Sequence, residues 1–443
     1  MRYKKSIFTH KFSNGSNKII LFNASNLALL SGTKEDFEFY DNLDSDNIII
    51  ENHENEENIK VLIDNKFIVP QHINEIEEET RRRKIRRKLA KEIRKNTIGF
   101  LRVSLTEYCN LSCKYCFVND IFKTKNEMSK KNLLKLLNWF LDINGNINPL
   151  VQYFGGEPLL RFDDIVECHN ILQRRMNKKI IKSFREEIVT NGTLMTEDMA
   201  EYFVKNNIEI TFSIDGWKSI NDKNRIDSQG NGSYDRIVKG MELYKKCGGK
   251  LSAIITPTED NMPIFEDIVK FLHENLNCET ISINTPQPTL NGWDIDGAKF
   301  AKAMMNCLEY CNEKEVKINH PGNNIVFLIN NKIPQTNSCM NLTYGQPTNT
   351  WGIYVTSAMK ISKCVVECDE RCSKNFENFT LDNEYLEWHF EDSINSNCMR
   401  CPGLNICGGG CSVENLLLDG DNNIEKCKFF KLMIPWVIER YSN

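Results

Sequence analysis

No run of apolar residues in this sequence of 443 approaches the roughly 20 that a membrane-spanning helix requires. The N-terminal segment lacks the order of basic, apolar and small residues that marks a secretory signal. A strong excess of one charge is also missing, since the net charge is −4, which provides no field that would attract nucleic acid. We therefore expect a cytoplasmic protein with neither a membrane nor a nucleic-acid partner.

Cysteine does not occur before Cys109, although the chain contains 17. Three cysteines form a tight trio, and nine more lie between Cys339 and Cys427. In a reducing compartment, such groups indicate metal binding or catalysis more often than disulfides. The remaining five are interpreted as small buried side chains: Cys168, Cys247, Cys278, Cys307 and Cys311.

Four regions differ in pattern. Residues 1–74 alternate short strands with helices, and their acidic stretch at 35–57 is interpreted as solvated surface. Residues 75–97 predict one linking helix, because acidic residues come first and basic residues last. Its many basic residues could bind nucleic acid, but a solvated linker face is favoured. A regular α/β region follows at 98–324, and a cysteine-rich region at 325–443 ends in a predicted helix.

Six β–α units are predicted in the α/β region, and they indicate a parallel sheet that is open or curled into a partial barrel. The strands are expected at 100–105, 151–154, 186–190, 208–214, 251–256 and 279–284. Helices are expected at 129–143 and 262–276. Distinctive residues follow the ends of the first four strands: the cysteine trio, Gly155-Gly156-Glu157, Asn191-Gly192 and Asp215-Gly216. Because the carboxyl ends of parallel strands share one rim, a site is expected there.

The trio Cys109, Cys113 and Cys116 suits three irons of a 4Fe–4S cluster, with the fourth iron open to another ligand. Zinc would usually require a fourth protein ligand or a catalytic water. A second signature lies near the C-terminus, in "CMRCPGLNICGGGC" followed by Cys427. For those cysteines, a four-cysteine zinc site is the alternative to an iron–sulfur cluster.

The trio, with Tyr115 inside it and "GGE" one unit later, resembles the signature of the radical S-adenosylmethionine (SAM) enzymes. The resemblance implies a partial (β/α)6 barrel whose open iron binds SAM, and a 5′-deoxyadenosyl radical that abstracts hydrogen from the substrate. It also implies SAM contacts: Tyr115 with the adenine, Gly155, Gly156 and Glu157 with the amino group, Asn191 with the ribose, and Ser213 and Arg225 with the carboxylate. Relatives usually carry His where this chain has Asn221.

The C-terminal cysteines resemble a SPASM domain, which holds two auxiliary clusters and brings the expected total to three 4Fe–4S clusters. The resemblance assigns Cys339, Cys364 and Cys411 to the first auxiliary cluster, and Cys398, Cys401, Cys407 and Cys427 to the second. The fourth iron of the first could be bound by Cys368 or Cys372, or could stay open for a cysteine of the substrate. Relatives have Gly where this chain has Met359.

The N-terminal region resembles the winged-helix-like recognition element of ribosomal-peptide maturases, which binds a leader peptide at a sheet edge. We therefore expect an enzyme that forms a crosslink in a precursor peptide, with a thioether from cysteine sulfur to carbon favoured. Another C–C or C–O crosslink, or formylglycine formation in a sulfatase, is the alternative. A non-enzymatic alternative is a zinc- or cluster-stabilised protein that binds nucleic acid.

The enzyme would need a reductant such as flavodoxin or ferredoxin. Asp215 is the candidate base, and turn capping is its alternative role.

Overall fold

The computed structural model describes most of the chain, and the following statements concern those residues. They are 2–13, 18–43, 45, 48–49, 56–94, 98–121, 125–144, 148–284, 295–320, 322–335, 351–362, 364–365, 373–379, 394–411, 418 and 423–441.

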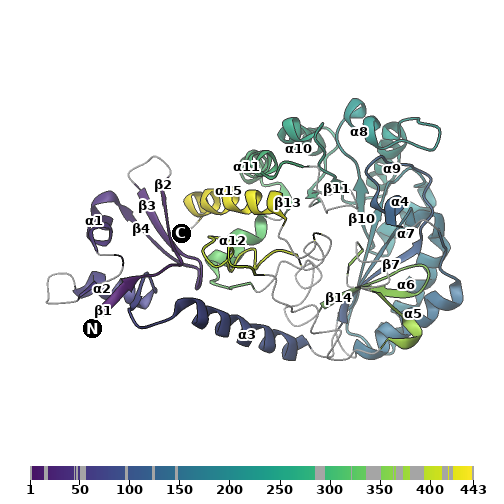
Figure 1. The fold of residues 1–443 in the computed structure, drawn as a ribbon. Helices are drawn as coiled ribbons and strands as arrows, with labels where there is room; N and C mark the ends of the chain where they lie inside the picture. The colour runs from purple at the N-terminus through teal and green to yellow at the C-terminus, as the bar shows by residue number, and fades with distance from the viewer. Residues whose placement is uncertain are drawn as a thin grey trace.

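The N-terminal module, residues 2–70, contains two three-stranded antiparallel sheets and two helices (Figure 1). The first sheet has the order β5-β1-β6, with β1 Arg2–Lys5, β5 Ile48–Ile49 and β6 Ile68–Pro70. The second has the order β2-β3-β4, with β2 Thr9–Ser13, β3 Lys18–Asn23 and β4 Ala28–Thr33. Helices α1 (Lys34–Asn42) and α2 (Glu56–Asp64) complete an α+β module.

Helix α1 corrects one sequence prediction. Its stretch was interpreted as solvated surface, but Phe37 and Tyr40 are buried in the core of the module. These two positions lie three residues apart and therefore on one helical face. The helix begins with a capping box in which Thr33 and Asp36 bind each other's backbone N–H groups. The acidic composition thus belongs to the outer face of an amphipathic helix.

Helix α3 (Glu75–Arg94) leads from the module toward the main sheet (Figure 1). It occupies most of the range predicted for a linking helix. The prediction of a solvated face is wrong for one side, because Glu75, Glu79 and Arg83 are buried. Their spacing of four residues places them in one row along the helix.

The main sheet has ten strands in the order β13-β12-β11-β10-β9-β8-β7-β14-β15-β16. The strands from β7 to β13 are parallel neighbours: β7 Ile98–Thr106, β8 Leu150–Gly155, β9 Arg185–Thr190, β10 Glu209–Ser213, β11 Ser252–Ile255, β12 Thr280–Ile283 and β13 Lys317–Asn319. The first six are the predicted strands. The short strand β13 adds a seventh, so the sheet extends beyond six β–α units.

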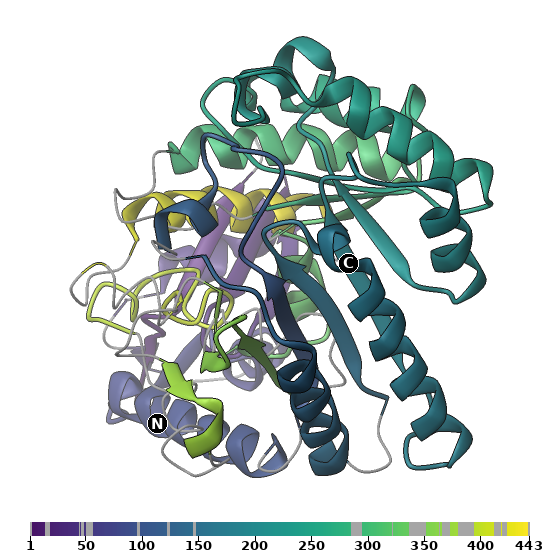
Figure 2. The same cartoon turned by 90° about the vertical axis from the view of Figure 1, so that its right-hand side faces the viewer.

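Helices of the β–α units lie in front of the strands in Figure 2. They bury apolar faces against the sheet, as in α10, where Phe265, Ile268, Val269 and Leu272 recur at helical spacing. The helical elements are α4 Phe117–Ile121, α5 Lys130–Asn144, η1 Pro158–Arg161, α6 Phe162–Asn177, α7 Glu197–Lys205, α8 Lys218–Asn224, α9 Tyr234–Lys246, η2 Met262–Ile264, α10 Phe265–Glu274, α11 Gly297–Glu313 and α12 Asn323–Asn330.

The C-terminal region adds β14 (Trp351–Val355), β15 (Lys360–Ser362), β16 (Ser373–Asn375) and η4 (Phe376–Asn378). Strand β14 pairs in parallel with β7, and β15 turns back antiparallel to β14. In that turn Met359 has φ +60, a left-handed conformation that favours glycine. This chain therefore keeps the backbone shape of a glycine position although it carries Met.

The closing helix α15 (Ile424–Tyr441) packs against α11 and α12, and it also contacts strand β2 of the N-terminal module (Figure 1). It contains Pro435. In the part of the chain that the structure describes, no helix combines the length and apolar character needed to cross a bilayer.

Candidate active site

The cysteine trio lies on the loop between β7 and α4, at the carboxyl end of the first parallel strand. Cys109, Cys113 and Cys116 are partly buried and form no disulfide. Two hydrogen bonds fix the backbone of this loop: Ser112 N donates to Ile226 O (2.7 Å), and Lys114 N donates to Asn224 O (3.0 Å). The end of α8 and the residues that follow it thus hold the cysteine loop in place, where the three thiols could share a ligand.

Gly155 and Gly156 bring the end of β8 against the residues that precede the trio. Gly156 N donates to Thr106 O (2.8 Å), and Glu157 N donates to Tyr108 O (2.9 Å). A Cβ atom on Gly156 would lie 2.0 Å from Tyr108 O, and Gly155 has φ +123. Only glycine fits such an approach between two backbones.

Glu157 is buried, and both of its carboxylate oxygens accept hydrogen bonds. One oxygen accepts from Leu159 N (2.9 Å) and Thr190 Oγ1 (2.6 Å), and the other accepts from Asn191 N (2.8 Å). Burial raises the pKa of this carboxyl group, and these three hydrogen bonds oppose the rise. Glu157 therefore ties the end of β9 to the glycine segment.

Asn191 is brought directly to the trio. Its Nδ2 lies 3.7 Å from Cys109 Sγ and donates to Asn110 Oδ1 (3.0 Å). Its Oδ1 accepts from Thr193 Oγ1 (2.6 Å) and Thr193 N (2.9 Å), which fixes the orientation of the amide. Asn110 also donates to Thr193 Oγ1 (2.7 Å).

A buried ion pair lies at the carboxyl end of β10. Both Arg225 and Asp215 are buried, and Arg225 donates two hydrogen bonds of 3.0 Å to separate oxygens of Asp215. Asp215 also accepts from Tyr115 Oη and from Thr256 N (3.0 Å). The Arg225 guanidinium stands 5.5 Å from the centre of the Tyr115 ring. Asp215, the candidate base, thus accepts hydrogen bonds from four donors. This arrangement holds Arg225 and Tyr115 in place.

Burial and the neighbouring charges shift the pKa values of Arg225 and Tyr115. Burial lowers the pKa of Arg225, but the neighbouring Asp215 and Tyr115 raise it more, so the net pKa lies above the ordinary value. Burial also raises the pKa of Tyr115 well above its ordinary value. Arg225 therefore stays cationic and Tyr115 stays neutral.

Asn221 and Ser213 differ in surroundings. Asn221 is buried; its Oδ1 accepts from Asp215 N (3.3 Å) and its Nδ2 donates to Ser233 Oγ (3.3 Å). The position where relatives carry His is here part of the turn that holds the ion pair. Ser213 is half-buried at the end of β10.

Two thiols of the trio, Cys109 and Cys113, are protonated unless a metal ion replaces the proton. Burial raises the pKa of Cys109 to about 12, with a further contribution from Glu157, while a hydrogen bond from Leu111 N opposes the rise. Burial also raises the pKa of Cys113, and Arg225 opposes it. A metal that bound these sulfurs would displace the protons. The N–H donors and the nearby cation suit anionic sulfur ligands.

Sequence reasoning missed Glu107, which precedes the trio. This buried carboxylate accepts from Asn126 N (2.8 Å) and Ser357 Oγ (2.5 Å), so it ties the cysteine loop to the β14–β15 turn. Thr190 and Asn110 were also missed. Nothing in their local sequence marks them, because their partners follow the ends of other strands.

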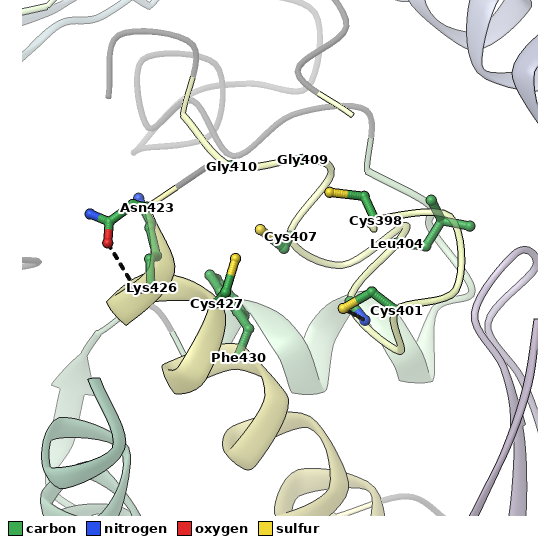
Figure 3. Close-up of a pocket in the computed structure, with 11 residues that line it drawn as sticks. Cys398, Cys401, Leu404, Cys407, Gly409, Gly410, Asn423, Lys426, Cys427 and Phe430 are labelled. Carbon is green, nitrogen blue, oxygen red and sulfur yellow. Dashed lines mark hydrogen bonds between the residues drawn. The ribbon is translucent and has the colours of Figure 1, made fainter. Parts of the chain in front are cut away.

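A second group of cysteines lines a pocket in the C-terminal region (Figure 3). Cys398, Cys401 and Cys407 come from one loop, and Cys427 comes from the first turn of α15. Their sulfurs face a common space. These are the four cysteines assigned to the second auxiliary cluster by resemblance, and the fold brings them together.

Burial raises the pKa of Cys407 to about 12 and also raises the pKa of Cys401 and Cys427. Gly403 N lies 3.3 Å from Cys401 Sγ. In the described parts of the chain, no three His, Cys, Asp or Glu side chains are arranged to hold a single metal ion.

The cysteines assigned to the first auxiliary cluster are only partly placed. Cys364 follows β15, and Cys411 follows the glycine run at 408–410. Cys339, Cys368 and Cys372 lie outside the described residues.

Residues 103–272 match the family model of the Radical SAM superfamily. The chain contains a radical SAM domain. This domain family implies SAM and one 4Fe–4S cluster as cofactors. The three thiols at the carboxyl end of β7, with their N–H donors and Arg225, fit that cluster.

The similarity to known proteins extends beyond the radical SAM domain. The chain is 25% identical to the radical SAM cyclopropyl synthase TigE of Paramaledivibacter caminithermalis, covering 94% of this chain and 87% of TigE. It is 24% identical to a cysteine-type anaerobic sulfatase-maturating enzyme of Clostridium perfringens, covering 76% of this chain and 96% of that enzyme.

Solved structures show the same fold. The sulfatase-maturating enzyme anSMEcpe with bound AdoMet superposes with a TM-score of 0.65 at 20% identity, covering 78% of this chain and all of that chain. SuiB of Streptococcus suis, bound to the precursor peptide SuiA, superposes with a TM-score of 0.54 at 20% identity, covering 93% of this chain and 95% of that chain. The α/β fold with its mixed sheet is therefore the radical SAM fold.

Proposed function

We propose that this radical SAM enzyme oxidatively modifies a ribosomally made precursor peptide, bound through a leader at the N-terminal module. The observation that carries the proposal is this module, residues 2–70, with its two small antiparallel sheets. The similarity to TigE covers 94% of the chain and that to SuiB covers 93%, whereas the similarity to the sulfatase-maturating enzyme covers 76%. An extended peptide could add to an edge strand such as β2 or β4.

We assign the bound SAM and its cluster to the rim of the parallel sheet. When bound, they supply a radical that abstracts hydrogen from the substrate. The chain's own residues then have distinct tasks. Gly156 lets two backbones approach, Asn191 donates toward Cys109, and Arg225 keeps a positive charge beside Cys113. We propose that Asp215 positions Arg225 and Tyr115, in place of acting as the base.

For the C-terminal cysteines, we propose an iron–sulfur cluster held by Cys398, Cys401, Cys407 and Cys427. Zinc–sulfur bonds of about 2.3 Å would draw four sulfurs tightly around one ion. Among the described residues, no three His, Cys, Asp or Glu side chains lie close enough together to hold a single ion, which supports a larger group. We also keep the assignment of Cys339, Cys364 and Cys411 to a first auxiliary cluster.

For the bond formed, we propose a thioether between a cysteine sulfur and a carbon of the peptide. A carbon–carbon bond is the second candidate, because the chain is 25% identical to a cyclopropyl synthase over nearly its whole length. Both products lack a pair of hydrogen atoms, but only the thioether consumes a thiol.

The test is anaerobic incubation of the reconstituted enzyme with SAM, a reductant such as flavodoxin, and short cysteine-containing peptides encoded beside its gene. Loss of a hydrogen pair that requires the leader, with the thiol no longer open to alkylation, supports the thioether. The same loss with a reactive thiol supports the second candidate. Unchanged peptides, together with formation of 5′-deoxyadenosine, would contradict a peptide substrate among those tested and favour a sulfatase-type protein substrate.

A further inference from the structure

Three segments far apart in the chain meet at a buried polar junction, which consists of Ser25, Glu79, Arg83 and Asn405. Ser25 is in the N-terminal module, Glu79 and Arg83 are on α3, and Asn405 is on the loop that carries three cysteines of the C-terminal pocket. Glu79, Arg83 and Asn405 have no exposed surface, and Ser25 is 3% exposed. Polar groups this deeply buried lower stability unless they are hydrogen-bonded, so their bonds specify how the segments fit.

Asn405 is bonded to all three segments at once. Its Nδ2 donates to Ser25 O (2.8 Å) in the module and to Glu79 Oε1 (2.9 Å) on α3. Its Oδ1 accepts from Arg83 Nη1 (2.7 Å). Glu79 completes the connection by accepting from Ser25 Oγ (2.6 Å). A displacement of the cysteine loop would therefore break bonds to both the helix and the module.

Arg83 binds the backbone of the same loop on either side of Cys407. Its Nη1 lies 3.3 Å from Leu404 O, and its Nη2 donates to Gly408 O (3.1 Å). Gly408 has φ +71, and the next two glycines also have positive φ, so this backbone turns in a conformation that most residues avoid. The planar guanidinium can hold two carbonyl groups at a fixed separation, which a single ammonium cannot do.

From these contacts we infer that Arg83 and Asn405 are positioning residues for the C-terminal cluster and couple it to the N-terminal module. The inference rests on the proposed cluster at Cys398, Cys401, Cys407 and Cys427. Loading of the cluster fixes the loop, and the loop then fixes the module through the junction. By reciprocity, a docked module favours the loop shape that binds the cluster. The positive charge of Arg83 also favours the reduced, more negative cluster.

The test uses the full-length protein in which the trio is replaced by alanine, so that only C-terminal clusters remain. Arg83→Gln is compared with Arg81→Gln, a matched change at an exposed position of the same helix. Three quantities are measured after anaerobic reconstitution: iron and sulfide per chain, the midpoint potential followed by electron paramagnetic resonance, and hydrogen–deuterium exchange of residues 18–33. Cys407→Ala identifies which signal belongs to this cluster.

We expect Arg83→Gln to load less iron, to shift the remaining cluster to a more negative potential, and to speed exchange in residues 18–33, with Arg81→Gln unchanged. Arg83→Lys should restore the potential, because the charge returns, but not the slow exchange. Asn405→Ala, a smaller change, should speed the exchange with little change in potential. Cluster loading of the parent protein should slow exchange at 18–33.

Two results would overturn the inference in different ways. If the parent loads iron at these cysteines but Arg83→Gln matches Arg81→Gln in all three measurements, the coupling is wrong and the cluster stands. If Cys407→Ala removes no iron from the parent protein, the proposed cluster itself is wrong, and the inference fails with it.

Discussion

Replacing Asp215 by Asn distinguishes a positioning carboxylate from a catalytic base. In the wild type, the Asp215 carboxylate pairs with Arg225 through two bonds of 3.0 Å, and both side chains are less than one-tenth exposed. The substitution leaves Arg225 buried without this counter-charge and puts an amide where four donors converge.

Removing one partner of a buried ion pair lowers the free energy of unfolding by about 3–5 kcal/mol. For a unit the size of the radical SAM domain, each kcal/mol lowers the melting temperature by about 2–4 °C. We therefore expect the melting temperature of the Asp215→Asn protein to fall by about 6–20 °C. The matched control is Asp235→Asn, because Asp235 pairs with Lys218 at the surface, where solvent screening leaves an ion pair little effect on stability.

The assay is anaerobic differential scanning fluorimetry of the iron-free proteins, with SAM cleavage measured on the reconstituted ones. A melting temperature equal to that of the control, combined with lost peptide modification and normal SAM cleavage, would refute the reasoning. That outcome would restore Asp215 as a candidate base.

Three further changes address other parts of the structure. Gly156→Ala should abolish SAM binding and lower iron at the trio while sparing iron at the C-terminal site, because a Cβ would lie 2.0 Å from Tyr108 O; equilibrium dialysis with normal affinity would contradict this. Cys407→Ala should remove iron from the C-terminal pocket and leave SAM cleavage intact, as iron analysis and 5′-deoxyadenosine yield would show; unchanged iron would count against the cluster. Burial lowers the pKa of His10 from 6.5 to about 4, so the unfolded chain takes up a proton first as the pH falls. The stability that His10 contributes is thus present above pH 6.5 and lost as the pH falls toward about 4, and thermal melts should show a smaller loss over this window for His10→Phe; equal losses would contradict the pKa shift.

The parallel strands were predictable because each is a short apolar run followed by a distinctive turn. Strand β7 has nearly all of its residues buried, as expected where helices or other elements cover both faces of a sheet. Strand β14 was not predictable, because its parallel pairing with β7 joins residues that lie far apart in the sequence. Local patterns of apolar residues carry no information about such a partner.

The site was predictable where spacing alone defines it. The sequence signalled Cys398, Cys401 and Cys407, and the fold adds Cys427 from α15 to the same pocket. The hydrogen bonds that hold the site residues in place were harder to predict from the sequence. The contact of Arg225 with SAM stays a prediction, and the bond from its guanidinium to Asp215, ten residues away, was not predicted.

The buried face of α3 shows the limit of composition most clearly. Charged residues are usually exposed, so a helix rich in them predicts a solvated face. Glu79 and Arg83 are buried because Ser25 and Asn405 satisfy their hydrogen bonds from segments on either side in the sequence. Only the assembled fold brings those partners together.

The most direct test of a peptide as the substrate is transfer of deuterium. The reconstituted enzyme would be incubated anaerobically with SAM, reductant and a leader-containing precursor peptide deuterated in its side chains. Deuterium in the 5′-deoxyadenosine, lost when the leader is removed and absent with Cys113→Ala, is the predicted result. Peptide-dependent product formation without deuterium in 5′-deoxyadenosine would contradict direct hydrogen abstraction from the peptide.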